Sequence, residues 1–215
     1  MTVKFMKPLA LPRALVALHL STMRLVRDRR GVAAVEFAVI VPLMLVMFFG
    51  TVEFSSGVAV DRKVSLVTQE LADLVSRNPS IADTDIANFN TIANAMLTPY
   101  STTPLKATMS ELYIDPATGA ARVQWSKGGA PRALRSTVTV PADLIARDSV
   151  TNAIFPNQYL IFTEATYLYT PAVGYVMAKA GVTLSDKTYM RPRLSSCVIY
   201  PTPAPGTTPP PCPVS

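Results

Sequence analysis

The sequence predicts an α+β fold in which a long amino-terminal transmembrane α-helix packs against a small antiparallel β-sheet domain. Two patterns predict the helix. Residues 32–49 form an apolar run long enough to cross a bilayer, and apolar side chains then recur every three or four positions to about residue 76. A third pattern predicts the sheet, because short β-branched and aromatic stretches alternate with proline and glycine turns between residues 111 and 190.

The apolar run has a basic flank and one internal charge. Four arginines lie between residues 24 and 30, and Glu36 is the one charged residue between positions 32 and 49. Basic flanks stay on the cytoplasmic side of a membrane. We therefore expect a single-pass protein with a cytoplasmic amino terminus and an exported domain after about residue 53.

The net charge of +6 arises entirely from the first 30 residues. The first 30 residues hold seven Lys/Arg and one acid, so the other 13 basic and 13 acidic side chains cancel. The basicity therefore belongs to the leader, where it sets orientation. Since nucleic-acid binding needs a basic surface, we expect no nucleic-acid partner for the exported domain.

Glu36 suggests a processing step. A carboxylate within a membrane helix is costly unless an opposite charge pairs with it. Cleavage after Gly31 would create an α-amino group on Val32, and in an assembly this amine could pair with Glu36 of a neighbouring subunit. The alternative is that Glu36 lies near the membrane edge and reaches the interface unpaired.

The same segment resembles the TadE-like pilus-assembly proteins, which are minor pilin-like (pseudopilin) components of tight-adherence type IV pilus systems. The resemblance rests on residues 30–37 (RGVAAVEF), on an apolar helix containing Pro42, and on residues 50–54 (GTVEF). It implies a pilin-like fold in the bacterial inner membrane with a periplasmic carboxy-terminal domain. It also implies a hetero-oligomer whose partners are a prepilin peptidase, other pilins or pseudopilins and the assembly machinery, in the membrane or in the pilus.

The resemblance assigns roles to four residues. Gly31 would be the last leader residue, cut by the prepilin peptidase, and Val32 the new amino terminus. Glu36 and Phe37 would be the acid and the aromatic residue of the family's cleavage site, and would contribute to subunit association. Phe37 stands where major pilins of such systems usually carry tyrosine, which fits a minor component.

The helix is expected to continue beyond the membrane. Its apolar stripe is followed by Arg77-Asn78-Pro79, residues that disfavour further helix. We expect five segments: a cleaved leader at 1–31, the transmembrane helix at 32–52, its amphipathic continuation at 53–78, an exported α+β head at 79–199 and a proline-rich tail at 200–215. The predicted stripe comprises Val60, Val64, Val67, Leu71, Leu74 and Val75.

The head is expected to contain a second helix and four to six short strands. The helix should run from Asp83 or Thr84 to about Leu97, with an acidic cluster suited to capping its amino terminus. Residues 127–131 are expected to form a loop. The expected strands are 111–114 and 121–125 around a turn at 115–119, then 137–140, 159–169, and a last hairpin made of 182–184 and 187–190.

Two further segments, 164–171 (EATYLYTP) and 188–193 (TYMRPR), also resemble TadE-like proteins, which often carry an E-A-x-Y-x-Y-x-P strand and a terminal R-P-R element. For Arg191 and Arg193 we expect a structural role, such as capping the sheet or pairing with acids. The alternative is contact with a partner subunit.

The two cysteines, Cys197 and Cys212, both lie in the segment expected to be exported. An oxidising compartment favours a disulfide between them. It would close a loop of about 16 residues, worth roughly 3 kcal/mol by chain entropy. The alternative is free or intermolecularly paired thiols. The proline-rich tail is expected to be mobile or pinned only through Cys212.

Catalytic constellations are not evident. The sole histidine, His19, lies in the leader, which excludes Ser-His and Cys-His nucleophiles in the exported domain. Helix capping explains Asp83 and Asp85, and a hairpin surface explains Glu111 and Asp115. We therefore expect no enzyme, no cofactor and no metal site. An anchored hydrolase without histidine is the weakest hypothesis and would need an acidic pocket.

The expected function is therefore that of a pseudopilin assisting tight-adherence pilus biogenesis. The alternative is an uncleaved single-pass envelope protein whose periplasmic domain binds a partner. A conventional secretory signal, cut near the small residues 57–59, is a further possibility. It is disfavoured because the apolar run exceeds the usual 7–15 residues of a signal core.

Overall fold

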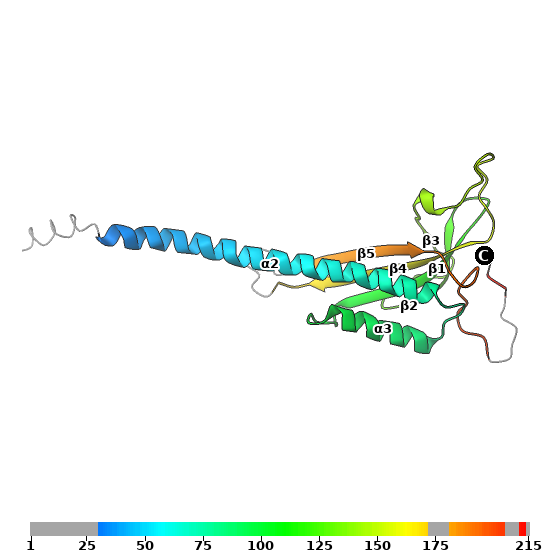
Figure 1. The fold of residues 1–215 in the computed structure, drawn as a ribbon, viewed down its shortest axis with the longest axis horizontal. Coiled ribbons are helices and arrows are strands. Elements are labelled where there is room, and N and C mark those ends of the chain that lie inside the picture. The colour runs from blue at the N-terminus through cyan, green and yellow to red at the C-terminus, as the bar shows by residue number, and fades with distance from the viewer. Residues whose placement is uncertain (1–29, 172–180, 205–210, 214–215) are drawn as a thin grey trace, which may run out of the picture. The chain divides into compact units, whose positions relative to one another are not determined.

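The computed structural model describes residues 30–171, 181–204 and 211–213 (Figure 1). The chain divides into two compact units, residues 1–49 and 50–215. Helix α2 (Arg30–Ser76) contributes to both units. The second unit also contains helix α3 (Asp83–Leu97) and a five-stranded antiparallel sheet. The α+β prediction is confirmed, whereas residues 1–29 of the leader and residues 172–180 lie outside the described residues.

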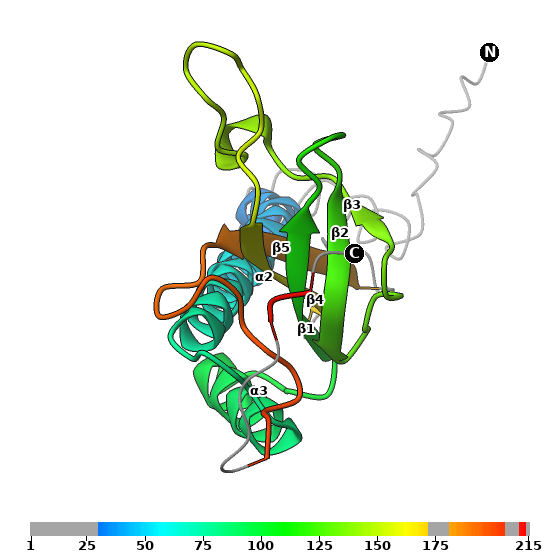
Figure 2. The same cartoon turned by 90° about the vertical axis from the view of Figure 1, so that its right-hand side faces the viewer.

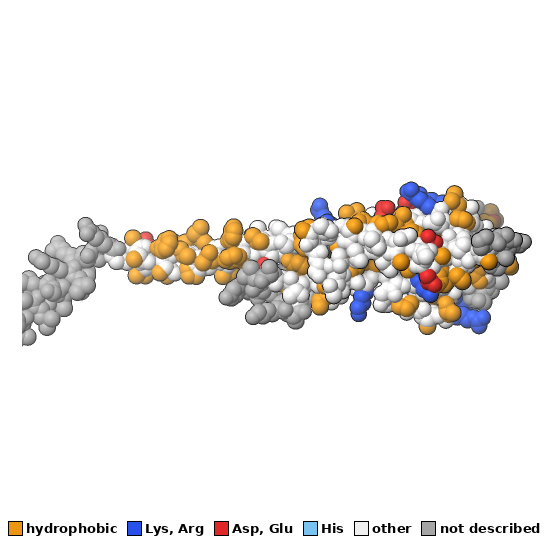
Figure 3. Space-filling model, turned by 90° about the horizontal axis from the view of Figure 1, so that it is seen from below, with side chains coloured by type: hydrophobic (Ala, Val, Ile, Leu, Met, Phe, Trp, Pro, Cys, Tyr) orange, Lys and Arg blue, Asp and Glu red, His pale blue; other side chains and the backbone are white. Residues whose placement is uncertain are grey.

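The first part of α2 is a bare apolar helix. Side chains 31–48 are exposed except the half-buried Val41, and Figure 3 shows hydrophobic side chains covering this part of the helix. Pro42 lies inside the helix, which continues past it. By length and composition α2 could cross a membrane, with a mean hydropathy of 2.5 in its most apolar window. Exposed apolar side chains of this kind need lipid or protein to cover them.

The second part of α2 packs into the core of the second unit. Five of the six stripe residues are fully buried, and Leu74 is partly buried against the same cluster. The helix ends where the Asn78 side-chain amide donates to the carbonyl of Leu74. The predicted stripe is thus confirmed, with Val60, Val64, Val67, Leu71 and Val75 at zero exposure.

Helix α3 has the predicted bounds. The backbone N–H of Ala82 donates to the Asp85 carboxylate at 2.8 Å, which satisfies a group at the helix start. From α2, the Lys63 ammonium donates to the carbonyls of Met96 and Thr98 at the carboxy-terminal end of α3. A cation there neutralises the negative end of the helix dipole, so Lys63 fixes α3 against α2.

The sheet has the order β3-β2-β1-β4-β5. Its strands are β1 (Leu105–Ile114), β2 (Ala121–Gly128), β3 (Thr137–Val138), β4 (Gln158–Tyr169) and β5 (Val182–Met190), and a short 3-10 helix, η1 (Ala142–Leu144), follows β3.

Three strand predictions are corrected. The expected hairpin over residues 182–190 is a single strand, because β5 pairs with β4 along its whole length and Asp186, in its middle, faces Thr68 of α2. Strand β1 starts six residues earlier than predicted. Strand β2 runs on to Gly128, within the predicted loop.

Each sheet face has its own core. Helices α2 and α3 cover one face (Figures 1 and 2), where Met109, Trp125 and Ile161 pack against the α2 stripe. The other face carries a smaller cluster of Leu112, Val123, Leu160 and Phe162, packed against residues of the long β3–β4 connection.

Gly128 allows close contact between β2 and β1. Its φ is +132°, and a Cβ at this position would lie 2.2 Å from the carbonyl oxygen of Ala107. A side chain cannot be accommodated there without moving backbone.

The carboxy-terminal segment, residues 193–204 and 211–213, folds back across the end of the helix-covered face. Ile199 exchanges backbone hydrogen bonds with residues 79–81, and Thr202 donates to Ile81. A disulfide joins Cys197 to Cys212, with Cα atoms 5.8 Å apart. For the described residues of the tail, the prediction that it is pinned only through Cys212 is wrong, because Thr202 also donates to the Ile81 carbonyl and the Pro213 carbonyl accepts from Tyr159.

Candidate functional site

The predicted processing segment occupies the first two turns of α2. Gly31 and Val32 follow the first helical residue, Arg30. A Cβ built on Gly31 meets no atom within 4 Å. Nothing in the described structure thus requires glycine there, either for space or for a positive φ. Any requirement for glycine at this position would come from a partner that handles the segment.

Glu36 and Phe37 are presented outward on this helix. Glu36 is exposed, and Phe37 and Val32 are 69% and 54% exposed. Val32 and Glu36 are four residues apart, which places them on one helix face. The carboxylate therefore stands on the same stripe as the residue predicted to become the amino terminus, within an otherwise uncharged surface.

The second unit contains a buried acid that the sequence analysis placed on a hairpin surface. That interpretation is wrong: Glu111 has zero exposure. It lies at an irregularity where β1 and β2 shift register. Its Oε1 accepts a hydrogen bond from the backbone N–H of Val198 at 2.6 Å, and the Trp125 indole N–H donates to the Val198 carbonyl at 2.7 Å. Side chains of the sheet thus bind both the backbone N–H and the backbone carbonyl of Val198.

Burial controls the ionisation of this cluster. Loss of solvation raises the pKa of Glu111 to about 8, with the Val198 hydrogen bond opposing the rise. Burial also raises the pKa of Tyr159 to about 12, with Glu111 and Tyr113 adding to the effect. Tyr159 is therefore a neutral donor, and its hydroxyl donates to the carbonyl of Pro213 at 2.9 Å. The cluster stabilises the carboxy-terminal segment against the sheet.

The two arginines of the 188–193 element have different environments. Arg193 pairs with Asp73 of α2 at 2.8 Å, and its backbone N–H donates to Ser76. The predicted pairing with an acid is therefore confirmed for Arg193. Arg191 instead donates to the Leu144 carbonyl at 3.1 Å, and within the described parts of the chain it forms no ion pair.

Acidic side chains in the second unit have structural partners. Arg132 binds the Glu164 carboxylate with two hydrogen bonds, at 2.6 and 2.7 Å. Asp148 accepts from the backbone of Val150 and Thr151, which holds a turn. Among the described residues, no group of three or more His, Cys, Asp or Glu side chains is arranged to hold a metal ion.

Comparison with known proteins identifies one family. Residues 31–73 match the family of the TadE-like protein. The resemblance found in the sequence is therefore confirmed over this segment, which contains Gly31, Val32, Glu36 and Phe37. The match does not extend to 164–171 or 188–193, where the resemblance stays a prediction. No curated protein and no solved structure matches the chain.

Proposed function

We propose, from the match of residues 31–73 to the TadE-like family, that this chain is a minor pilin-like (pseudopilin) component that assists biogenesis of a tight-adherence type IV pilus. A prepilin peptidase cuts after Gly31, and the mature chain starts at Val32. The apolar helix crosses the bacterial inner membrane once, with the leader in the cytoplasm and the head in the periplasm. The proposal assigns no catalytic role and no cofactor.

One observation carries the proposal. Glu36 is an exposed carboxylate on a helix whose other exposed side chains from 32 to 48 carry no charge. In hydrocarbon such a group needs a counter-charge, and no cation lies on this stretch of the helix. A new α-amino group on Val32 of a neighbouring subunit supplies that charge on the matching helix face.

Two further features support the scheme. No atom lies within 4 Å of a Cβ built on Gly31, so no packed side chain of the described structure covers this position. The disulfide between Cys197 and Cys212 fits an exported head, because such bonds persist in oxidising compartments. The pairing of Glu36 with the new α-amino group also selects processed neighbours, because an uncleaved chain has no α-amino group on Val32.

The test is the intact mass and amino-terminal sequence of the protein from its own membranes, with and without the prepilin peptidase. We expect a start at Val32 only when the peptidase is present. A start at Met1 in both strains would refute processing and favour the alternative, an uncleaved envelope protein with a partner-binding domain. A start near Val60 would identify an ordinary signal peptide.

Subunit association is tested separately with Glu36→Gln, which keeps the side-chain volume and removes the charge. We expect normal cleavage but loss of pili and of co-purifying pilins. Phe48→Tyr is the matched control, because it alters an exposed side chain of the same helix outside the cleavage site and leaves the charge in place. Normal piliation by the Glu36→Gln strain would refute the pairing while leaving cleavage intact.

A further inference from the structure

The sheet has an unpaired notch beside the first residues of β4. Strand β4 pairs with β1 as far as Gln158, opposite Ile114. Its pairing with β5 stops at Ile161, opposite Met190. The chain then turns away at Pro192, and Arg193 bonds to the end of α2. Among the described residues, 158–160 therefore have a strand on one side only. Edge strands present backbone N–H and C=O groups to any chain that can pair with them.

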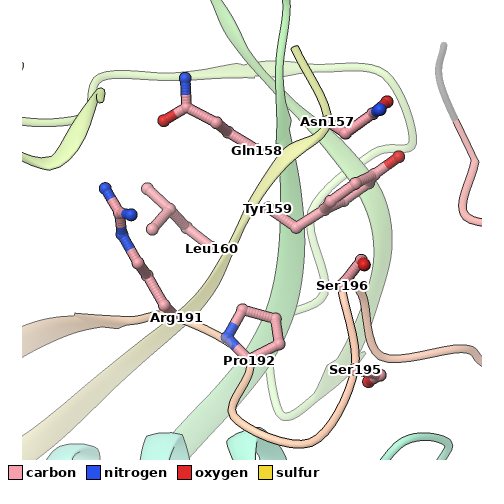
Figure 4. Close-up of a pocket in the computed structure, with 8 residues that line it drawn as sticks. All are labelled: Asn157, Gln158, Tyr159, Leu160, Arg191, Pro192, Ser195 and Ser196. Atoms are coloured by element: carbon pink, nitrogen blue, oxygen red, sulfur yellow. The ribbon is translucent and has the colours of Figure 1, made fainter. Parts of the chain in front are cut away.

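A pocket of about 170 Å³ fills this notch. Figure 4 shows Gln158 and Leu160 on one side of β4, together with Arg191, and Asn157 and Tyr159 on the other. This alternation is what an added strand would meet, because its own side chains alternate in the same way. The lining residues are Asn157, Gln158, Tyr159, Leu160, Arg191, Pro192, Ser195 and Ser196.

Several polar groups of the pocket already have partners within the chain. The Gln158 amide accepts from the Ala146 N–H and donates to the Ala146 and Phe155 carbonyls. The Ser195 hydroxyl donates to the Cys197 carbonyl. Gln158 and Ser195 therefore stabilise the sides of the notch, and other groups must bind a partner.

Arg191 supplies the charge. A guanidinium has five N–H donors in a fixed fork. The bond to the Leu144 carbonyl uses one of them and fixes the side chain on the Leu160 side of the strand. None of the eight lining residues is acidic. The notch thus combines unpaired strand edge with a held cation, which is complementary to an extended segment carrying a carboxylate.

We propose that this notch binds an extended segment of a partner protein, which adds a short strand beside residues 158–160 and places an Asp or Glu side chain on Arg191. The occupant is an acidic side chain within a strand, because the alternation of β4 directs every second partner residue to the Arg191 side. This site is independent of processing at Gly31, since all of it lies in the second unit.

The experiment uses the full-length ¹⁵N-labelled protein in detergent micelles. The probe is a five-residue peptide with blocked termini and with β-branched residues around a central glutamate. The control peptide has glutamine in place of that glutamate. We expect the glutamate peptide to shift the amide signals of Tyr159 and Leu160 in a saturable way. The glutamine peptide and the Arg191→Gln protein should each bind about two- to fivefold more weakly, the effect of losing one exposed charge pair.

Arg135→Gln is the matched control, because Arg135 is an exposed arginine outside the pocket, and it should bind like the wild type. Arg191→Glu with a lysine-centred peptide should restore binding, which separates loss of charge from loss of fold. Equal binding of the glutamate and glutamine peptides would overturn the role of Arg191. Shifts confined to the outer edge of β5, with none at residues 158–160, would overturn the notch itself.

Discussion

Glu111 gives the head a pH-dependent stability that a single substitution should remove. Its carboxyl is fully buried between β1 and the carboxy-terminal segment, and among the described residues only Oε1 has a hydrogen-bond partner. Glu111→Gln keeps the shape and the acceptor for the Val198 N–H, and it cannot ionise. The buried amide gains N–H groups that need acceptors, so a cost of about 1–3 kcal/mol is expected at low pH.

The direction in which the free energy of unfolding changes with pH follows from the raised pKa of Glu111. Burial raises the pKa of Glu111 in the folded state to about 8, against 4.5 for an ordinary glutamate. Below pH 4.5 both folded and unfolded chains hold the proton, so the stability is fully present. As the pH rises toward 8, only the unfolded chain releases it, and stability falls by up to about 1.4 kcal/mol per pH unit. The free energy of unfolding should therefore fall by about 4 kcal/mol between pH 5 and pH 8.

The assay is urea unfolding of the full-length protein in detergent across this pH range. Trp125 is the one tryptophan of the chain and bonds directly to Val198, so its fluorescence reports on the carboxy-terminal segment. The Glu111→Gln curve should be nearly flat with pH and should cross the wild-type curve. Glu70→Gln, at an exposed position of α2, should keep the wild-type slope. A Glu111→Gln protein with that same slope would refute the reasoning.

Two further predictions concern the same carboxy-terminal region. Cys197→Ser should lower the free energy of unfolding by about 3 kcal/mol, the loop-closure value for a 15-residue separation. The urea midpoint of this variant should equal that of the reduced wild-type protein. A midpoint equal to that of the oxidised wild-type protein would contradict this prediction. Arg193→Ala should cost about 1 kcal/mol in urea unfolding, because its ion pair with Asp73 is half exposed. Arg77→Ala, which removes the more exposed arginine bound to Asp73, should cost less. The reverse order would contradict the argument that the less exposed ion pair contributes more.

The helices could be predicted because their signals are local. The three- and four-residue spacing of the α2 stripe and the bounds of α3 are set by neighbouring residues, and the structure reproduces both. The buried face of α3 consists of Ile86, Phe89, Ala93 and Leu97, whereas the apolar Ile92 at its margin is 38% exposed. A local pattern cannot decide which margin of an apolar stripe meets the core.

The errors lie where distant segments decide the outcome. Glu111 sits in a strand beside a turn, a setting typical of a surface acid, and Val198 covers it from 87 residues away. The centre of β5, Ser185-Asp186, has the composition of a turn, but contact of Asp186 with Thr68, 118 residues earlier, keeps the strand continuous. The notch at β4 was equally hidden, because it depends on where β5 stops pairing.

The effect of Glu36→Gln on pili can be separated from any effect on the fold of the head, because Glu36 lies outside both of its cores. Side chains 31–48 are exposed, apart from the half-buried Val41, and take no part in either core of the second unit. Glu36→Gln should therefore leave the urea unfolding of the head unchanged. If pili are lost while Trp125 fluorescence reports a wild-type transition, the loss belongs to assembly in the membrane. Variants of Glu111 or Cys197 cannot be interpreted this way, because both side chains are buried in the head and their loss changes its stability.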